Sequence, residues 1–460
     1  MASNSNPRIL GTAPIRKLLI QYSIPAITGM TLVSLYHIID SIFIGHGVGA
    51  MAISGLAITF PLMNLAMAFC TLISSGASAL ASIRLGQKDL NGATDVLGNA
   101  VMICLINSIA LSVLSYFFLD AILTFFGASD ITLPYAHDFM YIILMGLPVS
   151  HLMIGLNNIM RATGYPQKAM LTSVVSVLAN IILAPVFIFY FHWGMRGAAT
   201  GTLLSQFIAM IWVLNHFMRK SSYVHLTRNF WKMKGSIIGN IFSIGMSPFL
   251  MNVCGCAMII VINNGLQKYG GDYAVGAYGI INRLLTLFLM IVLGLTMGMQ
   301  PIAGYNYGAR NMQRVWKTLK LGIIMGVLIT SIGTFFFEFF PHFISGFFTN
   351  SKELIDIAVP GLRICAFMFP VVGCQVVIST FFQSIGKAKI SIFLALCRQL
   401  VYFLPCLLIF PVHFGQKGVW AAIPVADFLS FVTAAVCLLV YMRKSNILSL
   451  GKFNYIISNK

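Results

Sequence analysis

Long apolar stretches alternate with short polar segments along the whole chain. A helix needs about 20 apolar residues to cross the hydrocarbon core of a bilayer, and each of these stretches is long enough. Turn sequences such as Gly164-Tyr165-Pro166 separate them. We therefore predict twelve transmembrane helices, over 16–44, 51–83, 94–118, 134–160, 168–191 and 197–219 in the first half of the chain and over 236–267, 273–305, 313–339, 353–384, 389–411 and 418–442 in the second half.

The twelve predicted spans divide into two sets of six on either side of a basic segment. This division predicts an all-α integral membrane protein in which two six-helix lobes are joined by a cytoplasmic linker. The expected boundaries are an N-terminal lobe over 1–218, a linker over 219–235, a C-terminal lobe over 236–445 and a cytoplasmic tail over 446–460.

The two halves also repeat in sequence. The spacing between Pro148 and Pro370 is the same as the spacing between Gly86 and Gly308. Because six spans is an even number, both halves enter the membrane in the same orientation. A parallel repeat about an axis normal to the membrane, with a cavity between the lobes, is typical of transporters.

Composition excludes the soluble classes of protein. Only 9% of the residues are charged, against about 25% in soluble domains. The net charge of +18 reflects a shortage of acids, since 29 Lys and Arg face 11 Asp and Glu along the chain, and it indicates no nucleic-acid partner. The nine cysteines lie within apolar stretches, where we interpret them as packing residues without disulfide or metal roles.

Basic residues are distributed unevenly between the predicted loops. Most of them, Arg161 among them, fall on the side that holds the N-terminus, and this bias predicts that both termini are cytoplasmic. The residues assigned to the opposite side are few: Arg196, Lys268, Lys352 and Lys417.

Ionisable residues inside a span are costly and therefore indicate function. Asp40 lies in the first span, with His37 three residues earlier on the same helical face. Burial favours the neutral acid, whereas a bound cation or a charged His37 favours the anion. We predict an ion-coupling site of Asp40, Asn180 and His37, with no metal beyond a sodium ion at Asp40. The alternative is that Asp40 and His37 are hydrogen-bonded structural residues.

Two opposite charges lie deep in adjacent spans of the second half, Arg398 and Asp427. A pair would lower the cost of both charges, so we predict a structural charge pair, with a substrate or proton role as the alternative. Arg283 has no partner that the sequence identifies.

The chain has 25 Met and 36 Phe residues. Flexible thioethers and aromatic faces suit varied hydrophobic cations, although core and lipid-facing packing explains most of them. The predicted substrate-binding residues are Tyr36, Asn157, Met290, Met297, Gln300 and Phe367.

Several motifs resemble the MATE family, the multidrug and toxic compound extrusion transporters, in its bacterial multidrug branch. They are Ile39 to Gly45, Arg161 to Pro166, Asn180 to Leu183, Gly298 to Ala309 and Pro424 to Asp427. The resemblance implies two six-helix bundles around a V-shaped cavity and efflux of hydrophobic organic cations in exchange for protons or sodium ions. It also implies the inner membrane of a bacterium, and we expect a monomer without cofactors.

One departure from the family pattern concerns the coupling ion. Members usually carry an Asp four residues after the Asn of the fifth span, where this chain has Ala184. A single carboxylate is a poorer sodium site, because hard cations prefer several oxygen ligands, and this favours protons.

Two other functions were weighed against export. A flippase for lipid-linked precursors shares the fold, but its pyrophosphate substrate would need a cationic cavity, and the spans offer only Arg283, Arg363 and Arg398. An intramembrane enzyme would need a catalytic cluster, and neither a His-Glu-x-x-His nor a Gly-x-Ser-x-Gly motif occurs. We therefore expect a transporter and no enzyme.

Overall fold

A computed structural model describes residues 8–219, 222–227, 231–347 and 352–444, except for the side chains of 34–38, 50 and 272. Within these ranges all regular structure is helical. The first half comprises α1 (Ile9–Thr12), α2 (Ile15–Gly47), α3 (Ala50–Gly86), α4 (Leu90–Phe117), α5 (Leu119–Phe125), α6 (Leu133–Met145), α7 (Leu147–Ala162), α8 (Pro166–Pro185), the π-helix η1 (Val186–Tyr190) and α9 (Gly194–Met218).

The second half repeats this order of long and short helices. It comprises α10 (Gly235–Gly308), α11 (Met312–Phe339), α12 (Pro341–Gly346), α13 (Lys352–Ala366), α14 (Phe369–Ser384), α15 (Ala388–Leu396), the π-helix η2 (Cys397–Phe403) and α16 (Leu404–Lys444). Backbone breaks with positive φ at Gly271 and Gly415 divide α10 and α16, so each of these helices contains parts of two spans.

The number of spans agrees with the sequence pattern. By length and composition, eight helices of the described residues can cross a membrane, or ten if each bent pair is one span. The stretch Ala388–Lys444 is counted as one of these helices, although Gly415 divides it into two spans. Helix α2, with 33 residues, is also long enough to cross the membrane. The predicted twelve-helix membrane fold is thus confirmed.

Two of the spans are sharply bent, which the sequence pattern did not predict. The helices α6 and α7 meet at 56°, and α13 and α14 meet at 49°. Pro148 and Pro370 stand in the first turn of the second helix of each pair. Proline lacks an N–H and clashes with the carbonyl four residues earlier, so it cannot continue a straight helix.

The repeat is visible in the backbone as well as in the sequence. Residues with positive φ recur at nearly the same spacing in both halves. The helix caps recur as well: the side chains of Asp89, before α4, and Asn311, before α11, each accept a hydrogen bond from an N–H of the following turn. The positive-φ pairs are Gly49 and Gly271, Lys88 and Arg310, Gly164 and Gly386, and Gly194 and Gly415.

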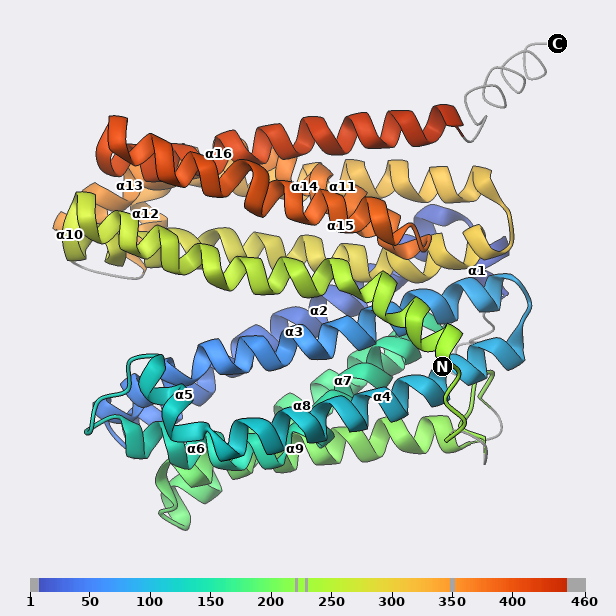
Figure 1. Cartoon of the computed structure of the whole chain (residues 1–460), viewed down its shortest axis with the longest axis horizontal. Coiled ribbons are helices and arrows are strands. Elements are labelled where there is room, and N and C mark those ends of the chain that lie inside the picture. Colours follow the sequence, from blue (N-terminus) through green and yellow to red (C-terminus); the bar gives the residue numbers. More distant parts are fainter. Residues whose placement is uncertain (1–7, 220–221, 228–230, 348–351, 445–460) are drawn as a thin grey trace.

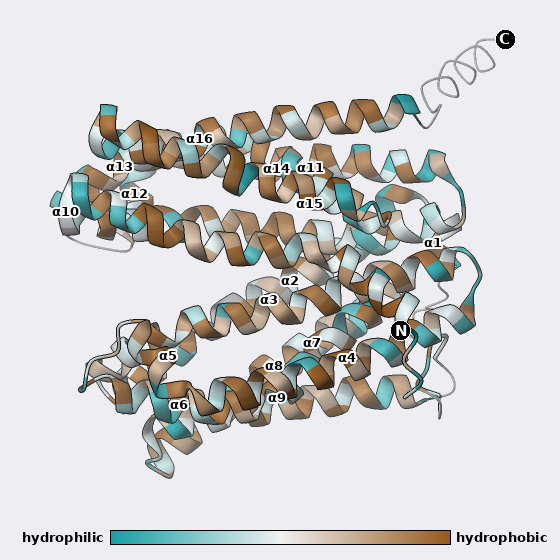
Figure 2. Ribbon diagram, in the orientation of Figure 1, coloured by the Kyte–Doolittle hydropathy of each residue, from teal (hydrophilic) through white to brown (hydrophobic). Residues whose placement is uncertain are grey.

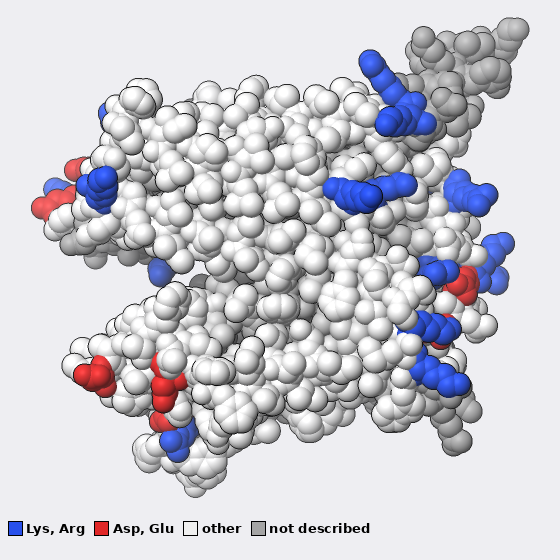
Figure 3. Space-filling view, in the orientation of Figure 1, with Lys and Arg blue, Asp and Glu red and all other residues white. Residues whose placement is uncertain are grey.

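The helices form two lobes that diverge toward one end (Figure 1). In the space-filling view a cleft opens between the lobes at the end opposite α1, and the wide band between the two ends is almost free of charge (Figure 3). Apolar residues predominate over the middle of the helices (Figure 2). Large apolar side chains such as Ile106 and Ile208 are exposed there, as expected for a surface that faces lipid.

At the other end, glycines close the junction between the lobes. A Cβ atom added to Gly76 of α3 would lie 2.0 Å from Ile241 O of α10, and one added to Gly245 would lie 1.7 Å from Leu72 O. The repeat-related contact joins Gly298 of α10 to Ser23 of α2. Small residues permit such close approach of helix backbones, so the lobes are packed tightly at this end.

The start of the chain reinforces this closed end. The Arg314 guanidinium of α11 donates to the carbonyl oxygens of Ala13 at 2.6 Å and Leu10 at 3.0 Å, and Asn306 Nδ2 donates to Leu10 O at 2.9 Å. These hydrogen bonds hold the segment around α1 against the C-terminal lobe. Because the same segment leads directly into α2 of the N-terminal lobe, it connects the two lobes at this end.

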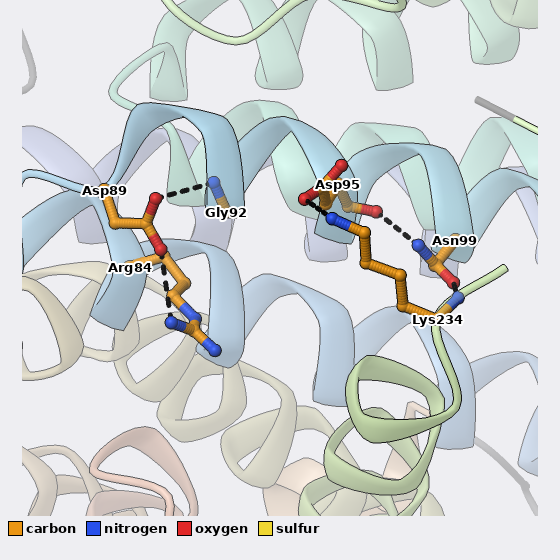
Figure 4. Close-up of polar contacts among 6 residues, drawn as sticks. All are labelled: Arg84, Asp89, Gly92, Asp95, Asn99 and Lys234. Carbon is orange, nitrogen blue, oxygen red and sulfur yellow. Dashed lines mark hydrogen bonds and ion pairs between the residues drawn. The ribbon is translucent and has the colours of Figure 1, made fainter. Parts of the chain in front are cut away.

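The linker is anchored to the N-terminal lobe (Figure 4). Lys234, directly before α10, donates its backbone N–H to Asn99 Oδ1 at 2.8 Å, and its ammonium group pairs with Asp95 of α4. In the neighbouring turn Asp89 accepts from Gly92 N and pairs with Arg84. The two contacts of Lys234 attach the first helix of the C-terminal lobe to the N-terminal lobe.

Candidate functional site

Helical periodicity indicates which face of α2 carries Asp40. A Cβ atom added to Gly29 of α2 would lie 3.3 Å from Ser173 Oγ of α8, and one added to Gly47 would lie 2.3 Å from Ile188 Cγ2 of η1. Asp40 is 11 residues from Gly29 and 7 from Gly47, and at 3.6 residues per turn both spacings return to the same helix face.

The facing surface of α8 carries the other predicted site residue. Asn180 follows Ser173 by 7 residues and Ala184 follows it by 11, so the three share one face of α8. This face also meets α9, since Asn180 donates to Thr202 and a Cβ atom added to Gly201 would lie 2.8 Å from Ala184 Cα. Asp40 is 6% exposed and Asn180 1% exposed. Both side chains are therefore buried within the fold.

Two oxygen atoms of this site lack a donor. Asn180 Nδ2 donates to Thr202 Oγ1 at 3.2 Å, which orients the amide oxygen away from that bond. Neither Asn180 Oδ1 nor Asp40 Oδ1 has a hydrogen-bond partner among the described residues. Buried acceptors are almost always satisfied, so a proton on the carboxyl group or a small cation would complete the arrangement.

Two members of the predicted set are not described by the structure at the level of side chains. Tyr36 and His37 lie in α2, but their side chains fall outside the described residues. Among the side chains that are described, no group of three or more His, Cys, Asp and Glu could hold a metal ion.

The predicted substrate-binding residues do not share one surface in this conformation. Met297 and Gln300 lie in the closed junction, where Gln300 Nε2 donates to Ser75 O at 3.3 Å. Asn157 is buried in α7, and its Oδ1 lacks a partner within the described part of the chain. Phe367 is 66% exposed at the break between α13 and α14.

One face of α10 forms a wall of the cleft. A Cβ atom added to Gly294 would lie 2.7 Å from Ile27 Cα of α2, so this face meets the N-terminal lobe. Met290, Leu287 and Arg283 precede Gly294 by 4, 7 and 11 residues and therefore lie on the same face toward the open end. Leu287 and Arg283 are exposed there and Met290 is half-buried.

In the C-terminal lobe, Arg398 of η2 and Asp427 of α16 form an ion pair. Arg398 Nε and Nη2 each lie 2.9 Å from Asp427 Oδ1, with 6% of the Asp427 side chain and 20% of the Arg398 side chain exposed. The pair links two adjacent spans deep in the lobe.

The sequence reasoning missed a polar cluster in the junction. Arg161, which the count of basic residues assigned to the side of the N-terminus, lies in the last turn of α7 and is only 7% exposed. Gln383, its equivalent in the second half, donates from Nε2 to Ser75 Oγ across the junction. The spacing between the two halves of the repeat could have identified Arg161 and Gln383. The same spacing relates Arg161 to Gln383 and Ser75 to Met297.

Comparisons with known proteins agree along the length of the chain. The MatE family model matches residues 25–186 and 243–408. The multidrug export protein MepA of Staphylococcus aureus is 27% identical over 439 residues, which cover 95% of both chains. MepA of Staphylococcus haemolyticus is 29% identical over 90% of this chain and 91% of its own.

Solved structures match equally well. The structure of the MATE multidrug transporter DinF-BH with a bound dye has a TM-score of 0.87 and 33% identity, covering 94% of this chain and 97% of the other. A MOP superfamily transporter from Pyrococcus furiosus has a TM-score of 0.89 at 23% identity, covering 97% and 99%, and so shares the fold. With its two repeated six-helix lobes and the match across both of them, this chain belongs to the MATE family of transporters.

Proposed function

We propose that this chain is an ion-coupled exporter of hydrophobic organic cations that works by alternating access. Relatives across its full length are named multidrug export proteins, and a solved family member at 33% identity was determined in complex with a dye. The observation that carries the proposal is that two buried oxygen atoms, on Asp40 of α2 and Asn180 of α8, both lack donors among the described residues.

These two oxygens give Asp40 two states. A proton on the carboxyl group can be donated to the Asn180 amide oxygen, whereas the anion leaves a negative charge that a cation would neutralise. An exporter needs such a group, because ion and substrate must bias the same conformational equilibrium in opposite directions. Ala184, fully buried beside the site, contributes no oxygen, which favours a proton as the coupling ion.

The distribution of charge supports an orientation for this conformation. Lys and Arg gather at the end that holds α1, opposite the cleft (Figure 3), and basic ends of membrane proteins face the cytoplasm. The cleft then opens to the outside of an inner bacterial membrane, and the glycine junction closes the cytoplasmic side. A substrate would leave the protein from this state.

The flippase alternative is not favoured by the positions of the three basic residues within the spans. Arg398 is paired with Asp427, and Arg363 lies 4.0 Å from Glu338. Arg283 is then the only one of the three without an ion pair within the described ranges, and a single cation is a weak site for a pyrophosphate group.

The decisive experiment replaces Asp40 by Asn, which keeps the volume and fixes the charge at zero. We expect Asp40→Asn to accumulate in the membrane and to lose most export of a fluorescent organic cation such as ethidium from proteoliposomes under an imposed pH gradient. The same assay under an imposed sodium gradient separates the two ions, and we expect the wild type to respond to the pH gradient.

The matched control is Asp138→Asn, the same chemical change in the same lobe. Asp138 pairs with Arg196 near the mouth of the lobe and is partly exposed, so this variant should transport like the wild type. Normal export by Asp40→Asn at normal expression would contradict the coupling role of Asp40.

A further inference from the structure

Each lobe is preceded by a short segment that docks on the other lobe. Residues 8–14 lead into α2 of the N-terminal lobe, but their carbonyl groups accept hydrogen bonds from α10 and α11 of the C-terminal lobe. Residues 231–234 lead into α10 of the C-terminal lobe, but Lys234 contacts α4 of the N-terminal lobe. We call these segments the N-terminal strap and the linker strap.

The two straps dock on equivalent helices. The spacing from Leu90 to Met312, at the starts of α4 and α11, equals the spacing from Phe117 to Phe339 at their ends. Each of these helices is the third long span of its lobe, and each receives the strap that leads into the other lobe. The crossed docking therefore recurs on both sides of the repeat axis and belongs to the architecture of the two lobes.

The N-terminal strap is held by a buried side chain and by charge-assisted hydrogen bonds. Leu10 is fully buried, and its carbonyl oxygen accepts from Asn306 Nδ2 at 2.9 Å and from Arg314 Nη2 at 3.0 Å. Arg314 Nη2 also donates to Ala13 O at 2.6 Å, and its Nε donates to Asn306 Oδ1 at 3.0 Å. Hydrogen bonds from a charged donor are about twice as strong as those between neutral groups.

This strap has almost no slack between its two attachments. Only Ala13 and Pro14 separate α1 from α2, and their ψ angles of 156° and 129° are those of extended backbone. A pair of residues that is already extended cannot lengthen further. Any separation of α2 from α11 must therefore break the hydrogen bonds of Arg314 to the strap.

The linker strap is equally short. The backbone N–H of Lys234 donates to Asn99 Oδ1, and α10 begins at the next residue, Gly235. Asn99 is 1% exposed, and its Nδ2 donates to Asp95 O at 2.8 Å, which fixes the amide for this contact. Any separation of the start of α10 from α4 must break the hydrogen bond between Lys234 and Asn99.

We propose that the two straps are crossed latches that hold the cytoplasmic side closed, and that both must detach before the lobes can separate there. This inference rests on the alternating access and the orientation proposed above. The hydrogen bonds of Arg314 and Asn99 exist only while the junction is closed, so they stabilise this conformation alone. Removing them should therefore raise the population that is open to the cytoplasm.

The rate at which a buried cysteine reacts measures that population without a transport assay. Ser78 is 3% exposed, and residues of both lobes surround it at the closed junction. In a background without the nine native cysteines, Ser78→Cys is treated with an impermeant thiol reagent in inside-out membrane vesicles. We expect Arg314→Met to raise its rate of reaction about tenfold, the equilibrium effect of one hydrogen bond to a charged group.

The linker strap has its own variant, which also serves if Arg314→Met does not accumulate. Asn99→Ala removes the acceptor of the Lys234 N–H and should raise the same rate, and the double variant should exceed either single one. The matched control is Lys320→Met, which removes an exposed charge from the same helix as Arg314 and should leave the rate unchanged.

A second cysteine position separates a latch from general loosening of the fold. Ser108 is fully buried in α4, and the reaction of Ser108→Cys should stay at its wild-type rate in every variant. Equal rates at Ser78→Cys in the wild type, Arg314→Met and Asn99→Ala would overturn the proposal, and so would an equal rise at Ser108→Cys. A wild type that exports nothing would contradict the proposed function, whereas these rates need neither a substrate nor an ion gradient.

Discussion

At the scale of single residues, the buried carboxylates of the two lobes differ in their hydrogen-bond partners. Asp427 accepts from two guanidinium N–H groups of Arg398 at 2.9 Å, so it has a fixed cationic partner. Asp40 has an oxygen without a donor among the described residues, as has Asn180 of the neighbouring helix α8. A group that lacks a fixed partner can change its charge at lower cost than one within an ion pair, so the N-terminal lobe holds the better candidate for ion coupling.

Ala184 offers a test of which ion is used. Ala184→Asp adds a second carboxylate on the face of α8 that carries Asn180, and more oxygen ligands favour a hard cation. We expect the variant to acquire or strengthen sodium-driven export of an organic cation in proteoliposomes while it retains export under a pH gradient.

The control for this variant is Ala184→Asn, which adds the same volume without the charge. Both variants should lower stability, because Ala184 is fully buried and a Cβ atom at Gly201 of α9 would lie only 2.8 Å from its Cα. An unchanged ion profile of Ala184→Asp at measurable expression would mean that this position does not help to select the ion.

At the scale of elements, α10 determines how closely the lobes approach. Gly245 in its first span contacts α3, and Gly298 in its second span contacts α2. The repeat relates the two contacts, because the spacing from Gly76 to Gly298 equals the spacing from Ser23 to Gly245. Each contact brings a helix against the backbone of the opposite lobe, where even a methyl group meets main-chain atoms.

We expect Gly245→Ala to weaken the closed junction. The new methyl group would lie 1.7 Å from Leu72 O, so the helices must separate at this end and the lobes must approach at the other. Spin labels at Ser129→Cys and Lys417→Cys, in a background without the nine native cysteines, should report a shorter distance between the open ends.

Gly255→Ala in the same helix is the matched control, because no atom lies within 4 Å of the position of its new methyl group. It should leave the distance distribution unchanged. Identical distributions for Gly245→Ala and Gly255→Ala would contradict the view that the glycine contacts hold the junction closed.

At the scale of the whole molecule, most of the Lys and Arg residues on the visible face gather at the end opposite the cleft (Figure 3). The described chain begins at α1 and ends with α16 at the same end (Figure 1), as an even number of spans requires. In the orientation proposed above, this end faces the cytoplasm.

Labelling from each side of the membrane tests this orientation. In the same cysteine-free background, Lys317→Cys should react with an impermeant thiol reagent only from the cytoplasmic side, and Ser129→Cys only from the outside. Both positions are exposed at their respective ends. Reaction of both from one side would contradict twelve spans with this orientation.

The sequence by itself determined the number of spans, most of their boundaries and the repeat. Hydrocarbon demands a long apolar helix at each crossing, so local composition suffices to find it, and α4 and α11 begin and end within about four residues of the predicted ranges. It also identified Asp40 and the Arg398–Asp427 pair, because charges within apolar spans are rare enough to be noticed.

Only the tertiary structure decided how the helix faces meet. The close contacts of Gly76, Gly245 and Gly298, the bends before Pro148 and Pro370, and the burial of Arg161 depend on which surface of one lobe packs against the other. Hydropathy registers how apolar a segment is and carries no information on the neighbour that each face contacts. Arg161 shows the difference: beside a turn sequence it resembles a loop residue, and the packing of α7 against α10 makes it a buried cation between two lobes.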